Sequence, residues 1–270
     1  MKLIEDAFRK QYQESIKNPA KTLDGHIANE NNVANDYRGR VLYEFFQNAV
    51  DRAESNIWVY MDLAARTLSI ANDGKPFSIE KDTDRKYSDF ESLCSINTSS
   101  KNQNESIGNK GVGFKSCWEY TKRATVVSKH KGFPWGFELK NPFVFMDIEQ
   151  IDFENILEIK TWLEDESIKA VINKDEKGKV PSFYFPRRLP DSEVESFFSK
   201  YPEAQTIITL HDIETTKCDD LIARIDDFSR HEIFFVKQLA TLQDKDLTLH
   251  IQVDDQDRVE IKTECNENEW

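Results

Sequence analysis

Glycine and cysteine are scarce in this chain, and long apolar runs are missing. Its 270 residues include nine glycines and four cysteines. The cysteines lack the paired spacing of a zinc site, so we expect free, buried thiols in a reducing compartment. The N-terminus is charged throughout, which argues against a cleaved signal peptide and a membrane span. The sequence therefore predicts a cytoplasmic protein without membrane contact.

Positive charge is also in short supply. The chain has 36 Lys and Arg residues against 49 Asp and Glu, which gives a formal net charge of −13. This balance argues against a broad nucleic-acid-binding face, although it leaves a local basic patch open. A hydrophobic content of 39% is enough for a core in one large domain or two small ones.

Three of the nine glycines fall within the motif GNKGVGFKS, residues 108–116. Such a cluster marks backbone that reaches unusual dihedral angles or lets a phosphate approach its N–H groups. A Walker A loop needs a lysine directly after the last glycine, but Phe114 stands there. A Rossmann fingerprint would place its third glycine at Ser116. The motif thus predicts either a phosphate loop of another kind or an ordinary turn before a helix.

A helix is predicted over residues 36–54, where apolar residues recur at helical spacing. Glu44, Asn48 and Asp51 fall together on the side opposite the apolar stripe. They are either a solvated face or part of a phosphoanhydride-hydrolysing site. In the second case Glu44 could orient the attacking water and Asn48 could hold Mg²⁺, which keeps several waters and few protein oxygens.

Residues 56–61 and 66–71 alternate as two strands joined by a short turn. The second strand runs into Asn72-Asp73-Gly74, and Asp followed by Gly is a common turn signal. A carboxylate there, beside a glycine that permits close approach, could also accept a hydrogen bond from the exocyclic amino group of a purine. Asp73 and Gly74 are therefore candidate nucleotide contacts.

In their order and spacing these three segments resemble the GHKL ATPases, the superfamily of DNA gyrase, the ninety-kilodalton heat-shock chaperone, histidine kinases and MutL. The resemblance implies that Glu44 activates water, that Asn48 ligates magnesium and that Asp73 contacts adenine. It also implies a phosphate loop that holds the ATP beneath a lid. That loop would consist of Gly108, Lys110, Gly111, Val112, Gly113, Phe114 and Lys115.

Residues 36–128 resemble more narrowly the branch that contains sacsin and the plant NO VEIN protein. The branch carries Pro-Phe in place of the second glycine of the adenine motif, as in Pro76-Phe77, and a lysine before the lid, here Lys101. Residues 206–213 resemble the strand whose threonine helps to bind adenine, which makes Thr206 a candidate. Lys101, Lys110 and Lys115 are either phosphate contacts or solvated surface lysines.

The resemblance implies an α/β fold of the Bergerat type, an α+β two-layer sandwich with a mixed, mostly antiparallel sheet and helices on one face. We expect an N-terminal helix and arm over residues 1–35. The ATP-binding domain would cover 36–215, with an insertion at about 140–200. Residues 216–270 would form a helix and a strand pair that could begin a transducer region, with further domains beyond residue 270 or a protein partner.

The expected function is Mg²⁺-dependent ATP binding with slow hydrolysis, coupled to lid closure at residues 97–110 and to conformational change in a chaperone-like, defence or DNA-processing protein. One alternative is a nucleotide-gated binding or dimerisation module with negligible turnover. A histidine kinase would need a phospho-acceptor histidine in a preceding helix pair, which these residues lack. Residues 1–35 either exchange between protomers in an ATP-dependent homodimer or pack back on their own domain.

Overall fold

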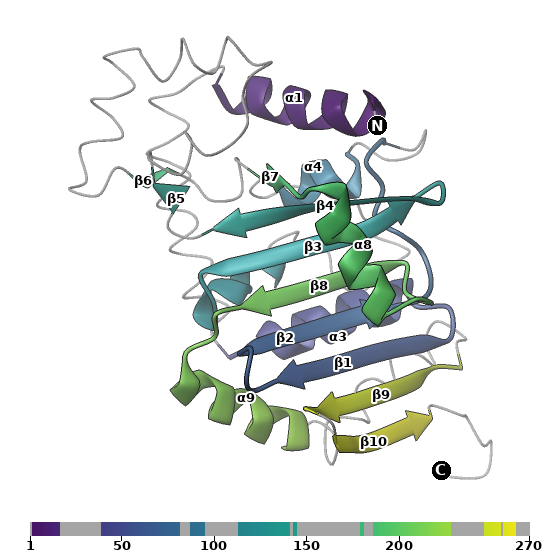
Figure 1. The fold of residues 1–270 in the computed structure, drawn as a ribbon, viewed down its shortest axis with the longest axis vertical. Helices are drawn as coiled ribbons and strands as arrows, with labels where there is room; N and C mark the ends of the chain where they lie inside the picture. Colours follow the sequence, from purple (N-terminus) through teal and green to yellow (C-terminus); the bar gives the residue numbers. More distant parts are fainter. Residues whose placement is uncertain are drawn as a thin grey trace.

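The computed structural model describes residues 2–16, 39–81, 87–94, 113–140, 143–144, 179–180, 186–227, 246–254 and 256–262. These residues form an α+β sandwich built on an open sheet (Figure 1). The sheet has eight strands in the order β10-β9-β1-β2-β8-β3-β4-β7. Its pairs are antiparallel except β1 with β9, which run parallel. The predicted mixed, mostly antiparallel sheet is therefore confirmed.

The centre of the sheet consists of two hairpins and a strand inserted between them. β1 (Asn56–Asp62) and β2 (Thr67–Asn72) form the first hairpin, and β3 (Arg123–His130) and β4 (Phe133–Lys140) form the second. In the second, Lys131 and Gly132 both have positive φ, as the favoured two-residue hairpin turn requires. β8 (Thr206–His211) lies between β2 and β3.

Shorter or peripheral strands complete the sheet. β9 (Thr248–Val253) pairs with β1, and β10 (Gln256–Lys262) pairs with β9. The predicted C-terminal strand pair thus belongs to the same sheet as the motif-bearing strands. β7 (Arg187–Arg188) pairs with β4, whereas β5 (Phe143–Val144) and β6 (Lys179–Val180) form a separate two-stranded sheet.

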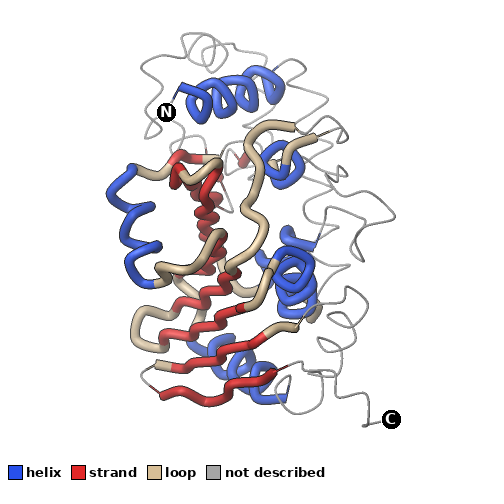
Figure 2. The backbone as a smooth tube through the Cα atoms, turned by 90° about the vertical axis from the view of Figure 1, so that its right-hand side faces the viewer, coloured by secondary structure: helices blue, strands red, loops and turns tan. Residues whose placement is uncertain are grey.

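Helices cover both faces of the sheet. α3 (Val41–Arg52), α4 (Asp89–Leu93), the 3₁₀ helix η1 (Gly113–Glu119) and α9 (Thr215–Asp227) share one apolar core with the sheet. α8 (Asp191–Lys200) packs through Val194 on the other face, over Ala71, Val127 and Ile207. Figure 2 shows α8 alone on its side of the sheet among the described helices. The expected helical face is therefore present, and α8 adds a cover to the second one.

The N-terminal helix α1 (Lys2–Ile16) lies against its own domain. Phe8 packs on Phe90 of α4 with ring centroids 4.8 Å apart, and the Gln11 amide donates to the Cys94 carbonyl at 3.0 Å. Lys10 pairs with Glu91 at 2.6 Å. The described part of the N-terminal segment therefore packs on its own domain, and its exchange on ATP binding stays a prediction. None of the described helices is long and apolar enough to cross a membrane.

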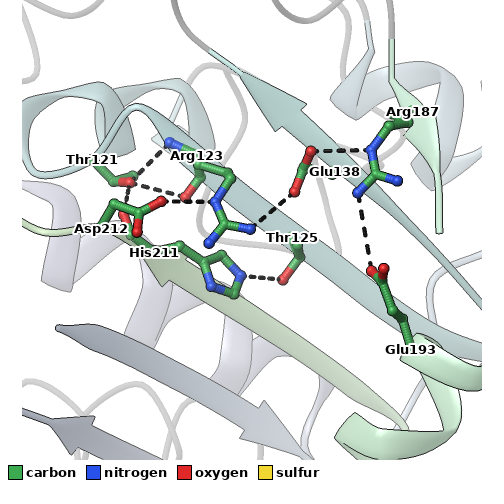
Figure 3. Close-up of polar contacts among 8 residues, drawn as sticks. All are labelled: Thr121, Arg123, Thr125, Glu138, Arg187, Glu193, His211 and Asp212. Carbon is green, nitrogen blue, oxygen red and sulfur yellow. Dashed lines mark hydrogen bonds and ion pairs between the residues drawn. The ribbon is translucent and has the colours of Figure 1, made fainter. Parts of the chain in front are cut away.

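A network of ion pairs joins β3, β4, β7 and α8 on the α8 side (Figure 3). The buried Glu138 carboxylate bridges Arg123 at 3.2 Å and Arg187 at 3.1 Å. Arg123 also bonds Asp212 at 2.8 Å, and Arg187 reaches Glu193 of α8 at 4.0 Å. Burial raises the pKa of the Glu138 carboxyl, but the hydrogen bonds and charges of the two arginines outweigh it and hold that pKa below its ordinary value.

Candidate functional site

Three buried polar side chains form a row across the middle of the sheet. Asn72 of β2 stands opposite Thr206 of β8, and Thr206 stands opposite Ser128 of β3. Each ends a series of alternate residues that faces the α3 side, because Leu68, Ile70, Val126, Ala124, Ile208 and Leu210 all lie in the core shared with α3. All three are at most 5% exposed. An otherwise apolar layer therefore contains a polar strip about 10 Å long.

Hydroxyl groups link two members of this row. The Ser128 and Thr206 hydroxyls lie 2.9 Å apart, and Ser128 also donates to the Gln205 carbonyl at 3.0 Å. The backbone N–H of Phe77 donates to Ser128 Oγ at 2.9 Å. The loop that follows β2 is thus held over the same end of the sheet.

Asn72 is the exception in this row. Its Oδ1 atom is buried and has no hydrogen-bond partner within the described part of the chain. By contrast, the Asn56 amide is held at both ends, since its Nδ2 donates to Asp73 at 3.0 Å and its Oδ1 lies 3.0 Å from His250 Nε2. A buried amide oxygen without a partner costs free energy, so such a group is expected to bind an ordered water, an ion or a ligand.

The neighbouring Asp73 carboxylate is fully engaged. Its Oδ1 accepts from the N–H groups of Glu54 and Ser55 at 3.0 Å each, and its Oδ2 accepts from Ser55 N at 3.2 Å and from Asn56 Nδ2 at 3.0 Å. Three N–H donors make these four contacts, because the Ser55 N–H is shared between the two oxygens. Burial raises the pKa of Asp73, but these hydrogen bonds outweigh it and hold the pKa below its usual range. Asp73 therefore stabilises the turn between α3 and β1, whereas the adjacent Asn72 lies in the buried polar row.

Gly74 allows this turn to lie directly on the end of α3. A Cβ atom at Gly74 would fall 1.9 Å from the Arg52 carbonyl oxygen and 2.5 Å from Glu54 N. The N–H of the next residue, Lys75, donates to that same Arg52 oxygen at 2.7 Å. The close approach predicted at Gly74 is therefore to the backbone of α3.

A buried ion pair ties the same loop to α4. Arg52 Nη2 lies 2.5 Å from Asp89 Oδ1, and the two side chains are 9% and 2% exposed. The Arg52 guanidinium also stacks over the Phe77 ring at 4.3 Å and donates to the Pro76 carbonyl. Asp89 in turn accepts from the backbone and hydroxyl of Ser78. The end of α3, the loop over the polar row and the start of α4 therefore form one clamp.

α3 carries the predicted catalytic and metal-binding side chains. Glu44, Asn48 and Asp51 are half-buried, and all three lie off the stripe that packs in the core. Each has at least one interaction with the rest of the chain. The polar row lies on the face of the sheet that α3 covers, because the buried residues of α3 share one core with Ile70 and Ile208.

The end of the glycine-rich motif packs on α3. The Phe114 ring stacks on Phe45 of α3 with centroids 5.7 Å apart. Lys115 is only 1% exposed, so it is not a solvated surface lysine. Burial raises the pKa of the Cys94 thiol at the end of α4, and the charge of Lys115 partly offsets that effect. The buried Lys115 and Cys94 side chains therefore act on each other electrostatically.

The remaining predicted phosphate contacts lie outside the described residues. These are Lys101, Gly108, Lys110, Gly111 and Val112, and only the backbone of Gly113 is described. No three His, Cys, Asp or Glu side chains gather as metal ligands in the described ranges. A Mg²⁺ ion bound through one amide oxygen, phosphate oxygens and water needs no such group, and Asn48 fits that oxygen-only chemistry.

No protein-family model matches the chain, and the search of curated proteins returns no match. The assignment to the GHKL superfamily therefore stays a prediction from the motifs. Sequence reasoning included Thr206 but missed Asn72 and Ser128. The alternation itself could have found them, since in each strand the apolar series on the α3 side ends in a polar residue.

Proposed function

We propose that the chain binds MgATP between α3 and the sheet and hydrolyses it slowly, with coupling to conformational change in a larger protein. The polar row of Asn72, Thr206 and Ser128 carries the proposal, because it places hydrogen-bonding groups in an apolar layer where a flat base could be recognised. The resemblance of the motifs to the GHKL ATPases supports the same site and indicates ATP as its ligand.

Each group of residues would bind a different part of MgATP or the attacking water. Asn72 and Thr206 would bind the base, and the N–H groups around the glycine-rich motif would bind the phosphates. Glu44 would orient and deprotonate the water that attacks the γ-phosphate, and Asn48 would hold the metal through its amide oxygen. Bound Mg²⁺ would neutralise charge that develops on the phosphate oxygens.

The clamp formed by Arg52 and Asp89 explains how nucleotide binding could reach the rest of the molecule. It connects the loop over the base site to α4, which ends at Leu93, and Cys94 follows directly before residues 95–112. Movement of that loop on base binding would therefore be transmitted to the start of the segment predicted to close over the nucleotide.

The test is calorimetric titration with MgATP followed by a phosphate-release assay. Glu44→Ala should bind MgATP within about threefold of the wild type and lose at least about a hundredfold in turnover, because a general base contributes that much to rate. Gln47→Ala, a half-buried polar position on the same helix, is the matched control and should keep both.

Absence of MgATP binding at millimolar nucleotide would refute the proposal. Tight binding by the wild type without measurable phosphate release would instead identify a nucleotide-gated binding or dimerisation module. Light scattering with a non-hydrolysable analogue would then show whether nucleotide changes the oligomeric state.

A further inference from the structure

We propose that the base site binds purines with either an amino or an oxo group at C6, so that 6-oxopurine triphosphates bind about as well as 6-aminopurine triphosphates. The inference rests on the proposed function, because it concerns the base that the row of Asn72, Thr206 and Ser128 would contact. Its basis is that the polar groups of the row are not held in one donor or acceptor state.

Asn72 is the first such group. An amide offers a carbonyl acceptor and an N–H₂ donor, and a half-turn about its last bond exchanges them. Among the described residues its Oδ1 has no partner, and none of them donates or accepts a hydrogen bond that holds the amide in one orientation. The Asn56 amide, fixed between Asp73 and His250, shows what a locked amide looks like in this fold.

Thr206 is the second. When Ser128 donates to the Gln205 carbonyl, the Thr206 hydroxyl can donate to Ser128 and show a lone pair to a ligand. When Ser128 donates to Thr206 instead, the Thr206 proton is available to a ligand. The Gln205 carbonyl stays satisfied in both cases, because it also accepts from the N–H of Lys129 at 3.0 Å. The hydroxyl pair can therefore reverse at little cost.

Turning the Asn72 amide and reversing the Thr206 hydroxyl each exchange a donor for an acceptor, which is also how 6-amino and 6-oxo purines differ. Adenine presents an N6–H donor beside the N1 acceptor, whereas hypoxanthine and guanine present an O6 acceptor beside an N1–H donor. A carboxylate only accepts, so it would favour the amino base and repel the oxo base by about tenfold to a hundredfold. The amide and the hydroxyl pair lose that discrimination because each can turn to suit either base.

The experiment compares the dissociation constants of MgATP and MgITP by titration calorimetry. ITP has the oxo edge without the 2-amino group of guanine, so the comparison changes polarity with little change in shape. For the wild type we expect the two constants to agree within about tenfold. A preference for either nucleotide above tenfold overturns the inference and leaves the proposed function standing, whereas failure of both to bind overturns both.

Two variants sharpen the result. Asn72→Asp, measured at pH 8 to keep the new carboxylate ionised, should raise the preference for ATP over ITP at least tenfold above that of the wild type. An unchanged ratio overturns the inference. Thr206→Val removes the hydroxyl with little change in shape, and it should weaken both nucleotides while their ratio stays within about threefold, since the Asn72 amide still turns. A Thr206→Val protein that binds only one of them contradicts the proposal.

Discussion

Asp73→Asn separates the two roles open to the acidic residue after β2. If Asp73 reads the base, as its motif position predicts, the substitution should weaken ATP binding and leave folding nearly unchanged. In the structure the carboxylate accepts four hydrogen bonds from the chain that joins α3 to β1. We therefore expect the opposite outcome, a loss of stability with little effect on nucleotide affinity.

The magnitude follows from these bonds. An asparagine oxygen can keep the bonds to Glu54 N and Ser55 N, but its N–H₂ group then faces the Asn56 amide donor. Turning the Asn56 amide to compensate would require His250 to change to the tautomer in which Nε2 accepts. The variant thus loses about one hydrogen bond to a charged acceptor and weakens the others. Because Asp73 is partly exposed, we expect a cost of about 2 kcal/mol, near the lower end for such bonds.

Urea unfolding at pH 7 measures this cost, and titration calorimetry of the folded variant should give an ATP dissociation constant within about threefold of the wild type. Asp254→Asn is a matched control, because Asp254 accepts one backbone bond, from Leu63, and has the positive φ that asparagine tolerates. Unchanged unfolding of Asp73→Asn together with at least tenfold weaker ATP binding would refute the reasoning and return the base contact to Asp73.

Two further predictions concern the fold, one beside the candidate site and one on the α8 side of the sheet. Gly74→Ala should lower the free energy of unfolding by about 2 kcal/mol, because its methyl group would strike the Arg52 carbonyl. Thermal unfolding measures the effect, and Gly132→Ala is the control, because an added Cβ there meets no atom and only the positive φ is unfavourable. A smaller loss of stability in Gly74→Ala than in Gly132→Ala would contradict the prediction. Glu138→Gln should cost about 2 kcal/mol at pH 7. Folding lowers the pKa of Glu138 below its ordinary value of 4.5. The stability that the Glu138 carboxylate contributes is therefore present above that pH and is lost as the pH falls through the folded-state pKa. Acid unfolding that is equally steep in the variant and the wild type would contradict this prediction.

Periodicity predicted most of the described elements, because apolar spacing reports directly which face is buried. It predicted the helix that became α3 and the strands of the first central hairpin, β1 and β2. It did not predict that η1 would be a 3₁₀ helix, nor that α8 would cover the second face of the sheet. Those outcomes depend on contacts between distant segments, such as Val194 of α8 with the strands beneath it, which local spacing does not encode.

The choice between Asn72 and Asp73 shows the same limit within the site. Adjacent residues at a strand end point to opposite sides, so one position decides which side chain faces the α3 layer. The motif directs attention to the acid, whose charge suits a ligand, yet that charge also suits three consecutive backbone and amide donors, Glu54, Ser55 and Asn56. Only the pairing of Asn72 with Thr206 shows that the neutral amide lies in the buried row. A strand-end motif therefore names a pair of candidates, and the register of the neighbouring strand shows which of them lies in the buried row.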